Sequence, residues 1–225
     1  MFGTGIGHYI PLVAYLGFWV MILVSLTGRP LLGLYYMLPF LPYRTMRNHF
    51  LTYPLGAQVL TILVFAIILG ALIQGKTLPK SKLYPIWLVY GAYLYVSMWI
   101  GTALSNAPAP LWLSDPNFST WKDYMLIPLV FVAAGLVVED RKAVRNVILI
   151  TAISLLFIDR SCILESMSRS WANFDEDKRS SGPLAYGSNQ TAAFLAQFAM
   201  FFWGFNQFVR RKKLKLFGSG LVAVT

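Results

Sequence analysis

The chain is poor in acidic residues and in charge as a whole. Nine of its 225 residues are aspartate or glutamate and 12% are charged, whereas 57% are hydrophobic. Soluble domains carry about 25% charged and about 45–50% apolar residues, so this composition excludes an ordinary soluble domain. Several apolar runs reach the roughly 18 residues needed to cross a hydrocarbon core about 30 Å thick. The composition therefore predicts an all-α, polytopic transmembrane bundle.

Cysteine is almost absent. The single residue Cys162 excludes an internal disulfide and a cysteine-rich metal site. The acids Asp159 and Glu165 and the cluster 175–177 supply too few oxygen ligands to predict a divalent metal, and we expect no cofactor. The first residues also lack the basic region of a cleaved signal peptide, so we expect the first apolar run to remain as a span.

Apolar runs mark the predicted spans. They cover residues 9–28, 56–74, 83–104, 124–138, 146–158 and 191–209, and a further run opens at 216. We expect about six to eight spans, the last one truncated, in a single transmembrane domain over residues 1–225. Because the final run stops at Thr225, we expect the chain to be the N-terminal portion of a longer protein.

Two stretches allow alternatives. Residues 30–43 contain Pro39 and Pro42 and form either a short span or an interfacial hairpin. Residues 162–174 carry apolar side chains at helical spacing, with Trp171 among them. We expect an interfacial amphipathic helix there, within a long outer loop over residues 159–190; a helix buried in protein is the alternative.

Basic residues give the orientation. They form three clusters in alternate loops, at Lys76, Lys80 and Lys82; at Arg141, Lys142 and Arg145; and at Arg210, Arg211, Lys212, Lys213 and Lys215. By the positive-inside rule these loops are cytoplasmic, which puts 105–123 and 159–190 outside. If 30–43 spans the membrane, the N-terminus lies outside as well; if it does not, the N-terminus lies inside.

The net charge of +10 lies in these loops, which indicates membrane orientation and anionic headgroups rather than nucleic acid. The inner clusters are rich in lysine, whereas the outer loops favour arginine. Arginine presents a planar fork that suits phosphate oxygens, so the outer face predicts a ligand that carries phosphate.

One outer segment could bind such a ligand. In "DKRSSGPLAYGSNQTAAFLAQF" (177–198), a glycine- and proline-rich turn leads into an apolar helix, and Asn189 is suited to cap that helix. A helix N-terminus favours an anion, and Arg179 lies a few residues before it. The alternative is an interfacial arginine beside an ordinary capped helix.

The stretch "RSSGPLAYGSNQTAAFLA" resembles the bacterial O-antigen ligase and polysaccharide polymerase superfamily. The segments "APAPLWLSDPNFSTWKDYMLIPLVF" and "LVVEDRKAVRNVI" are similar to members that assemble exopolysaccharides. The resemblance implies a multi-pass protein of the bacterial inner membrane. It also implies transfer or polymerisation of glycan units from an undecaprenyl diphosphate carrier on the periplasmic face, alongside other polysaccharide-assembly proteins.

The resemblance also assigns residues. Arg179 matches the arginine that binds the carrier's diphosphate, and Gly182 and Asn189 match its turn and helix start. Helpers on the same loop are Arg160, Arg169 and Lys178. The catalytic residues of the family are expected beyond Thr225.

Two other classes of function remain open. A transporter or flippase for an anionic or lipid-linked solute would carry charged residues within its spans. A non-catalytic membrane subunit would instead dock its partners through the basic cluster at 210–215 or through small residues on helix faces.

Overall fold

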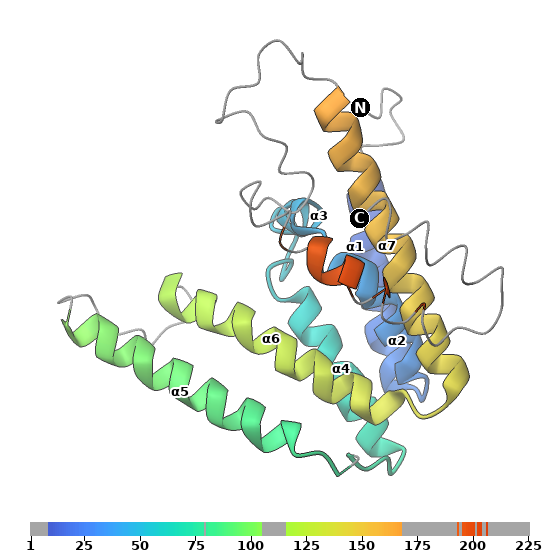
Figure 1. Ribbon diagram of the computed structural model, residues 1–225. Helices are drawn as coiled ribbons and strands as arrows, with labels where there is room; N and C mark the ends of the chain where they lie inside the picture. Colours follow the sequence, from blue (N-terminus) through green and yellow to red (C-terminus); the bar gives the residue numbers. More distant parts are fainter. Residues whose placement is uncertain are drawn as a thin grey trace. The chain divides into compact units, whose positions relative to one another are not determined.

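The computed structural model describes residues 9–78, 80–104 and 116–167, together with 193, 195–200, 202, 203 and 206. Of these residues, 83% are helical and none lies in a strand. The helices are α1 (Ile10–Leu26), α2 (Pro30–Met37), the 3-10 turn η2 (Leu38–Phe40), α3 (Arg44–Phe50), α4 (Val59–Ile73), α5 (Leu83–Leu104), α6 (Pro116–Val137) and α7 (Arg141–Met167). The all-α expectation is confirmed for this part of the chain (Figure 1).

The chain forms two compact units. Unit 1 comprises Met1–Phe18, Tyr35–Gln58 and Arg141–Thr225. Unit 2 comprises Trp19–Leu34 and Val59–Asp140.

In unit 1, the segment after α2 returns to the N-terminal half of α1. The hydroxyl of Tyr36 donates a hydrogen bond to the carbonyl of Ala14 at 2.8 Å. The hydroxyl of Tyr15 donates to the carbonyl of Pro54, which lies farther along the chain, at 2.5 Å. Phe18 lies between them, fully buried, with its ring centroid 5.0 Å from that of Phe40. These contacts show that η2 and α3 lead the chain back toward the end where α1 begins.

Helix α7 packs beside this returning segment. Asn146 donates a hydrogen bond to the hydroxyl of Tyr35 at 3.4 Å, and the hydroxyl of Tyr43 lies 3.4 Å from that of Ser161. Asn146 precedes Ser161 in α7, and their partners follow the same order in the chain, Tyr35 before Tyr43. Therefore α7 runs in the same direction as the segment 35–43 of unit 1, from Arg141 toward the level of Tyr43.

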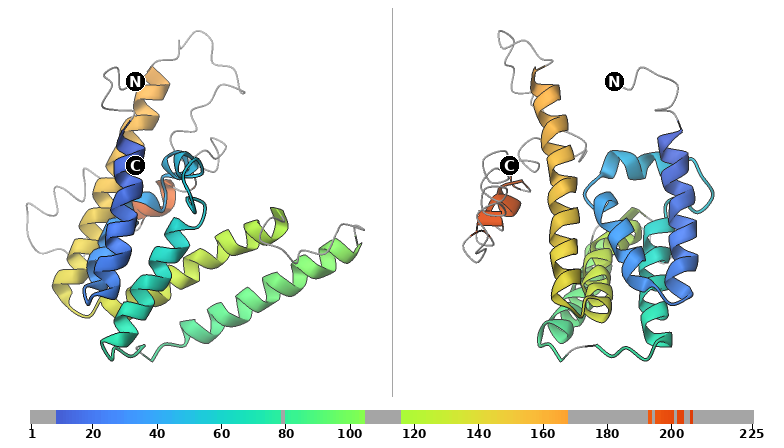
Figure 2. Two further views of the ribbon diagram at one scale, coloured as in Figure 1. Left: turned by 180° about the vertical axis from the view of Figure 1, so that it is seen from behind. Right: turned by 90° about the vertical axis from the view of Figure 1, so that its right-hand side faces the viewer.

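Unit 2 contains an antiparallel hairpin of α5 and α6, which lie side by side in both views of Figure 2. The rings of Tyr84 and Phe131 pair near one end at 5.5 Å, and those of Tyr95 and Trp121 pair farther along at 5.1 Å. Between them, Trp121 donates its indole N–H to the carbonyl of Gly91 at 3.3 Å. The aromatic residues of α5 that face α6 therefore hold the hairpin together.

Small residues join α1, α2 and α4 within unit 2. Ser25 is fully buried, and its hydroxyl donates to the carbonyl of Met21 at 2.7 Å. A Cβ atom on Gly33 would overlap the Ser25 hydroxyl, and one on Gly70 would overlap the Ser25 carbonyl. Only residues without a side chain allow the backbones to approach this closely.

The ends of α4 and α6 are linked in the same unit. The ammonium of Lys76, just after α4, lies 3.2 Å from the carboxylate of Glu139, just after α6. The segments that follow α4 and α6, which were predicted to share a side of the membrane, therefore begin next to each other.

The predicted element boundaries were partly wrong. The helix that contains the apolar run 124–138 begins earlier, at Pro116, and Phe118 and Trp121 pack together in its first turns. The span expected at 146–158 belongs to α7, which continues unbroken to Met167. Residues 159–167 are therefore helix and not outer loop, and no separate amphipathic helix begins at 162; residues 168–174 of that prediction lie outside the described residues.

The short segment 30–43 forms α2 and η2. At 1.5 Å per α-helical residue and about 2 Å per 3-10 residue, these elements extend about 18 Å, less than a hydrocarbon core.

Candidate functional site

Most of the predicted site lies outside the described residues. This holds for Arg179, Gly182 and Asn189, and for the helpers Arg169 and Lys178. The remaining helper, Arg160, is described: it lies in α7, seven residues before its end at Met167, and its side chain is exposed.

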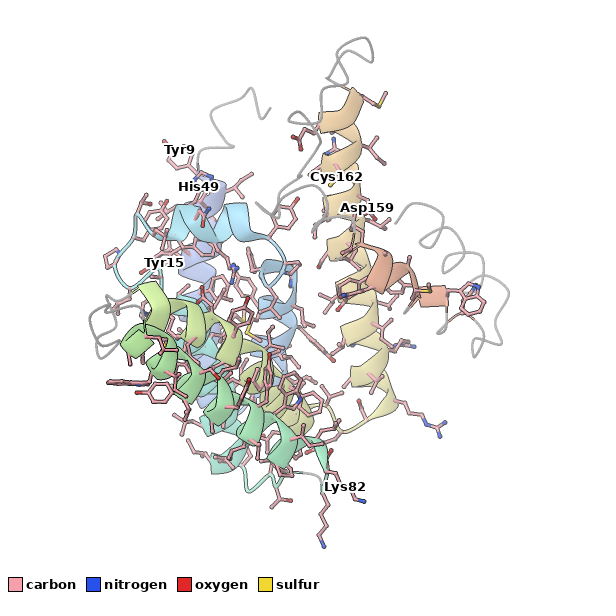
Figure 3. The ribbon with its side chains drawn as sticks, turned by 60° about the vertical axis from the view of Figure 1, so that its left-hand side comes forward. Tyr9, Tyr15, His49, Lys82, Asp159 and Cys162 are labelled. Atoms are coloured by element: carbon pink, nitrogen blue, oxygen red, sulfur yellow. The ribbon has the colours of Figure 1, made fainter. Side chains whose placement is uncertain are left out.

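The residue that precedes Arg160 in α7 is a buried acid. Asp159 was expected on the outer loop, but it lies within α7 and is 2% exposed. Ala152, Leu155 and Ile158 occupy the same buried region of α7 and pack with Phe202. Helical geometry separates the two neighbours, so that the acid faces the protein and Arg160 faces out. Figure 3 shows Asp159 and Cys162 one turn apart on α7.

A tyrosine and a serine join this turn of α7 to the segment that leads into α3. The Ser161 hydroxyl donates to the carbonyl of Phe157 at 2.9 Å, so its single proton is engaged. Tyr43 must therefore donate to Ser161 in their 3.4 Å contact. Tyr43 also packs against the cluster around Phe202 and directly precedes α3. The start of α3 and the Asp159–Arg160 turn are thus neighbours within unit 1.

Helix α3 is basic. Its sequence, RTMRNHF, contains no acidic residue, and Arg47 and His49 lie in its last turn. His49 is exposed, whereas Arg47 is partly buried and its Nε atom is enclosed by protein. A guanidinium keeps its charge at any physiological pH, so packing holds a permanent cation here.

The described residues include arginines on two helices of unit 1. No group of three or more histidine, cysteine, aspartate or glutamate side chains within the described ranges could hold a metal ion. Permanent cations are present at this end of unit 1 on both α3 and α7. Such groups can bind phosphate oxygens through charge-assisted hydrogen bonds.

Sequence reasoning missed the burial of Asp159 and the roles of Tyr43 and Ser161. The predicted span ended at Ile158 because two charged residues follow it. The available signal was periodicity, because Leu155, Asp159 and Cys162 continue one helical face across that boundary.

The structure defines an all-helical protein in its described part. There, α5 over Leu83–Leu104 and α7 over Arg141–Glu165 are long and apolar enough to cross a membrane. Comparison of the chain with known protein families, with curated proteins and with solved structures gives no match.

Proposed function

We propose that the chain is a multi-pass protein of the bacterial inner membrane, with about six to eight spans. The exposure of α5 supports this. Only 6% of its most apolar window is buried, and Leu88, Tyr93 and Leu104 are 73%, 66% and 82% exposed. Soluble proteins rarely leave so much contiguous apolar surface in water, whereas lipid covers it without penalty.

The contacts support one orientation. The segment 30–58 returns to the N-terminal half of α1, and α7 runs parallel to its part 35–43. The Lys76–Glu139 pair joins two basic loops. We therefore propose that 74–82 and 138–145 are cytoplasmic, and that α3 and 168–190 lie on the opposite side. This corresponds to the alternative in which the N-terminus is outside and 30–43 crosses the membrane as a short span. Since its helices extend only about 18 Å, the bilayer would have to thin around it.

We further propose that the protein takes part in glycan transfer from an undecaprenyl diphosphate carrier at the outer face. The observation that carries this is the resemblance of the segment beginning at Arg179. The course of α7 supports it, because α7 starts at the basic cluster of Arg141 and ends just before this segment. A phosphate-binding loop there would lie on the side of the membrane away from the cytoplasm. This is the side on which we propose that glycan transfer takes place.

The chemistry suits a site made of cations. An acceptor hydroxyl attacks the sugar's anomeric carbon, the carbon–oxygen bond to the diphosphate breaks, and the diphosphate leaves with the electron pair. A base takes the hydroxyl proton. Since the leaving group carries its negative charge, guanidinium groups such as Arg179 and Arg160 can stabilise it and hold it in line.

The orientation can be tested with single cysteines. In a Cys162→Ser background, Asn48→Cys and Ser188→Cys should react with a membrane-impermeant maleimide on spheroplasts. Thr77→Cys, an exposed residue after α4, should react only after permeabilisation. Labelling of Ser188→Cys only in permeabilised cells would reject the proposed site.

The activity can be tested by Arg179→Ala in the producing bacterium. Glycan polymer should be lost while the protein level stays normal, because the diphosphate loses its cation. Arg145→Ala, which removes an exposed arginine from the cytoplasmic end of α7, is the matched control and should leave polymer unchanged. Normal polymer length and yield with Arg179→Ala would refute the assignment.

One observation favours a transporter as the second candidate. Asp159 is a buried acid within a helix that can span a membrane, and such residues often line solute or proton paths. A flippase would move fluorescent undecaprenyl diphosphate-linked sugar across the bilayer of proteoliposomes, and Asp159→Asn would slow it. A glycosyltransferase would leave the lipid in its original leaflet.

A further inference from the structure

The turn after α3 exposes two leucines. Leu51 and Leu55, in the turn segment 51–58, are 61% and 60% exposed. Leu55 also has a positive φ of 56°, a left-handed conformation that residues other than glycine rarely adopt. In water this turn would combine backbone strain with exposed apolar surface, and both are unfavourable. The proposed glycan transfer makes no use of this segment.

The residue before the turn packs well inside the start of α1. The ring of Phe50 lies 6.3 Å from that of Tyr15 and 5.5 Å from that of Phe18. These partners lie five and eight residues after Ile10, where α1 begins (15 − 10 = 5; 18 − 10 = 8), or about 8 to 12 Å along the helix. The 17 residues of α1 extend about 26 Å, which is less than a hydrocarbon core of about 30 Å. With α1 as a span, the turn therefore lies at the boundary between headgroups and acyl chains.

Backbone polar groups of the turn are bonded within the protein. The carbonyl of Pro54, a residue without an N–H, accepts the hydrogen bond from the Tyr15 hydroxyl. Three N–H groups donate to nearby carbonyls, namely Tyr53 to Phe50 at 2.9 Å, Gly56 to Tyr53 at 3.0 Å and Gln58 to Leu55 at 2.8 Å. A turn that contacts lipid needs such bonds, because acyl chains offer no hydrogen-bond partner.

Helix α3 suits the same boundary. It runs across the axis of α1 in the right-hand view of Figure 2, and Figure 3 shows His49 near Tyr9, at the end where α1 begins. Leu51 continues the helical conformation and lies about 100° around the axis from the buried Phe50, at the side of the helix. The exposed Asn48 lies about 160° from Phe50 and faces away from the interior. The helix contains basic and no acidic residues, which complements anionic headgroups.

We infer that α3 and the turn 51–58 form a lipid-binding element in the outer leaflet, which rests on the proposed membrane topology. Leu51 and Leu55 insert between acyl chains, and the polar side of α3 faces the headgroups. The partner is the phospholipid leaflet itself. Contact with lipid offsets the cost of the left-handed conformation of Leu55.

Fluorescence quenching in proteoliposomes of phosphatidylcholine and phosphatidylglycerol tests the inference. The full chain, in a Cys162→Ser background, carries one bimane label at Leu51→Cys or Leu55→Cys. A phospholipid with a nitroxide near the glycerol end of its acyl chain should quench both labels more strongly than aqueous iodide does. Both labels should lie within about 10 Å of the headgroups. Asn48→Cys is the aqueous control, and Leu88→Cys in α5, where the leucine is 73% exposed, is the lipid control.

Stronger quenching by iodide at Leu51→Cys or Leu55→Cys overturns the inference. Protection from both quenchers also overturns it, because protein would then cover the turn. If Leu55→Cys does not fold, Leu51→Cys decides alone.

The two proposals can fail separately. If only the leucines of the turn report water while Leu88→Cys reports lipid, the lipid-binding element is wrong and the membrane protein stands. If Leu88→Cys also reports water, both are wrong. If Leu51→Cys and Leu55→Cys report lipid while Arg179→Ala leaves glycan assembly intact, the lipid contact stands and the proposed transferase activity is wrong.

Discussion

Gly70 provides the sharpest test of the packing. In α4 this residue is buried, and a Cβ atom added to it would overlap the backbone carbonyl of Ser25. Because the obstacle is main chain, it cannot rotate away as a flexible side chain would. Gly70→Ala must therefore push α1 and α4 apart within unit 2.

The magnitude follows from two opposing terms. Alanine is favoured over glycine in a helix by about 1 kcal/mol. Overpacking costs about 1–3 kcal/mol, and the upper part of this range applies where backbone is displaced. We expect a net destabilisation of about 1–2 kcal/mol, or roughly a 5- to 30-fold smaller ratio of folded to unfolded protein. For a chain of this size this corresponds to a fall of about 2–8 °C in Tm.

Gly101 is the matched control, because it also lies in a helix but has no atom within 4 Å of an added Cβ. Gly101→Ala should be neutral or should raise the Tm slightly. Thermal unfolding in detergent, followed by tryptophan fluorescence, compares the two variants. Equal Tm values for Gly70→Ala and Gly101→Ala would contradict the close approach of α1 and α4.

Three further variants test other contacts. Leu155→Ala removes a side chain that is 1% exposed, and it should destabilise the protein by about 2–5 kcal/mol in chemical denaturation; a loss below about 1 kcal/mol would be incompatible with a packed α7 face. Tyr43→Phe deletes the hydrogen bond to Ser161 and should cost about 0.5–1.5 kcal/mol, whereas an unchanged Tm would show that the contact contributes nothing. Lys76 and Glu139 should couple by less than about 1 kcal/mol in a double-mutant cycle, since the glutamate is 64% exposed, and salt should weaken the coupling. A larger or salt-independent coupling would mean that the pair is buried.

Much of the helix content could be predicted from the apolar runs. The span expected at 83–104 matches α5 at both ends, because apolar side chains dominate it and polar residues flank it. The long helix α7 was divided at Ile158 because a hydropathy argument treats charge as a boundary. Tertiary packing overrides that rule, since an acid can lie inside a helix when the surrounding protein encloses it.

Contacts between residues far apart in the chain are a second feature that could not be predicted from the sequence. Arg160 was identified as a helper from its charge, and its exposure on α7 is consistent with an available cation. Nothing in the sequence showed that Tyr43 lies beside Ser161, because the two are 118 residues apart. Long-range contacts depend on how helices pack, which local periodicity does not encode.

The amino-acid sequence by itself determined the helical class and the apolar runs, and it predicted the side of each basic cluster, because these depend on local hydrophobicity and charge. Only the tertiary structure decided that the chain returns along α1 after α2 and that Asp159 turns inward. It also brought α3 to the end of α7. These features arise from the packing of small and aromatic residues between helices, and residues distant in the chain become neighbours only when that packing forms.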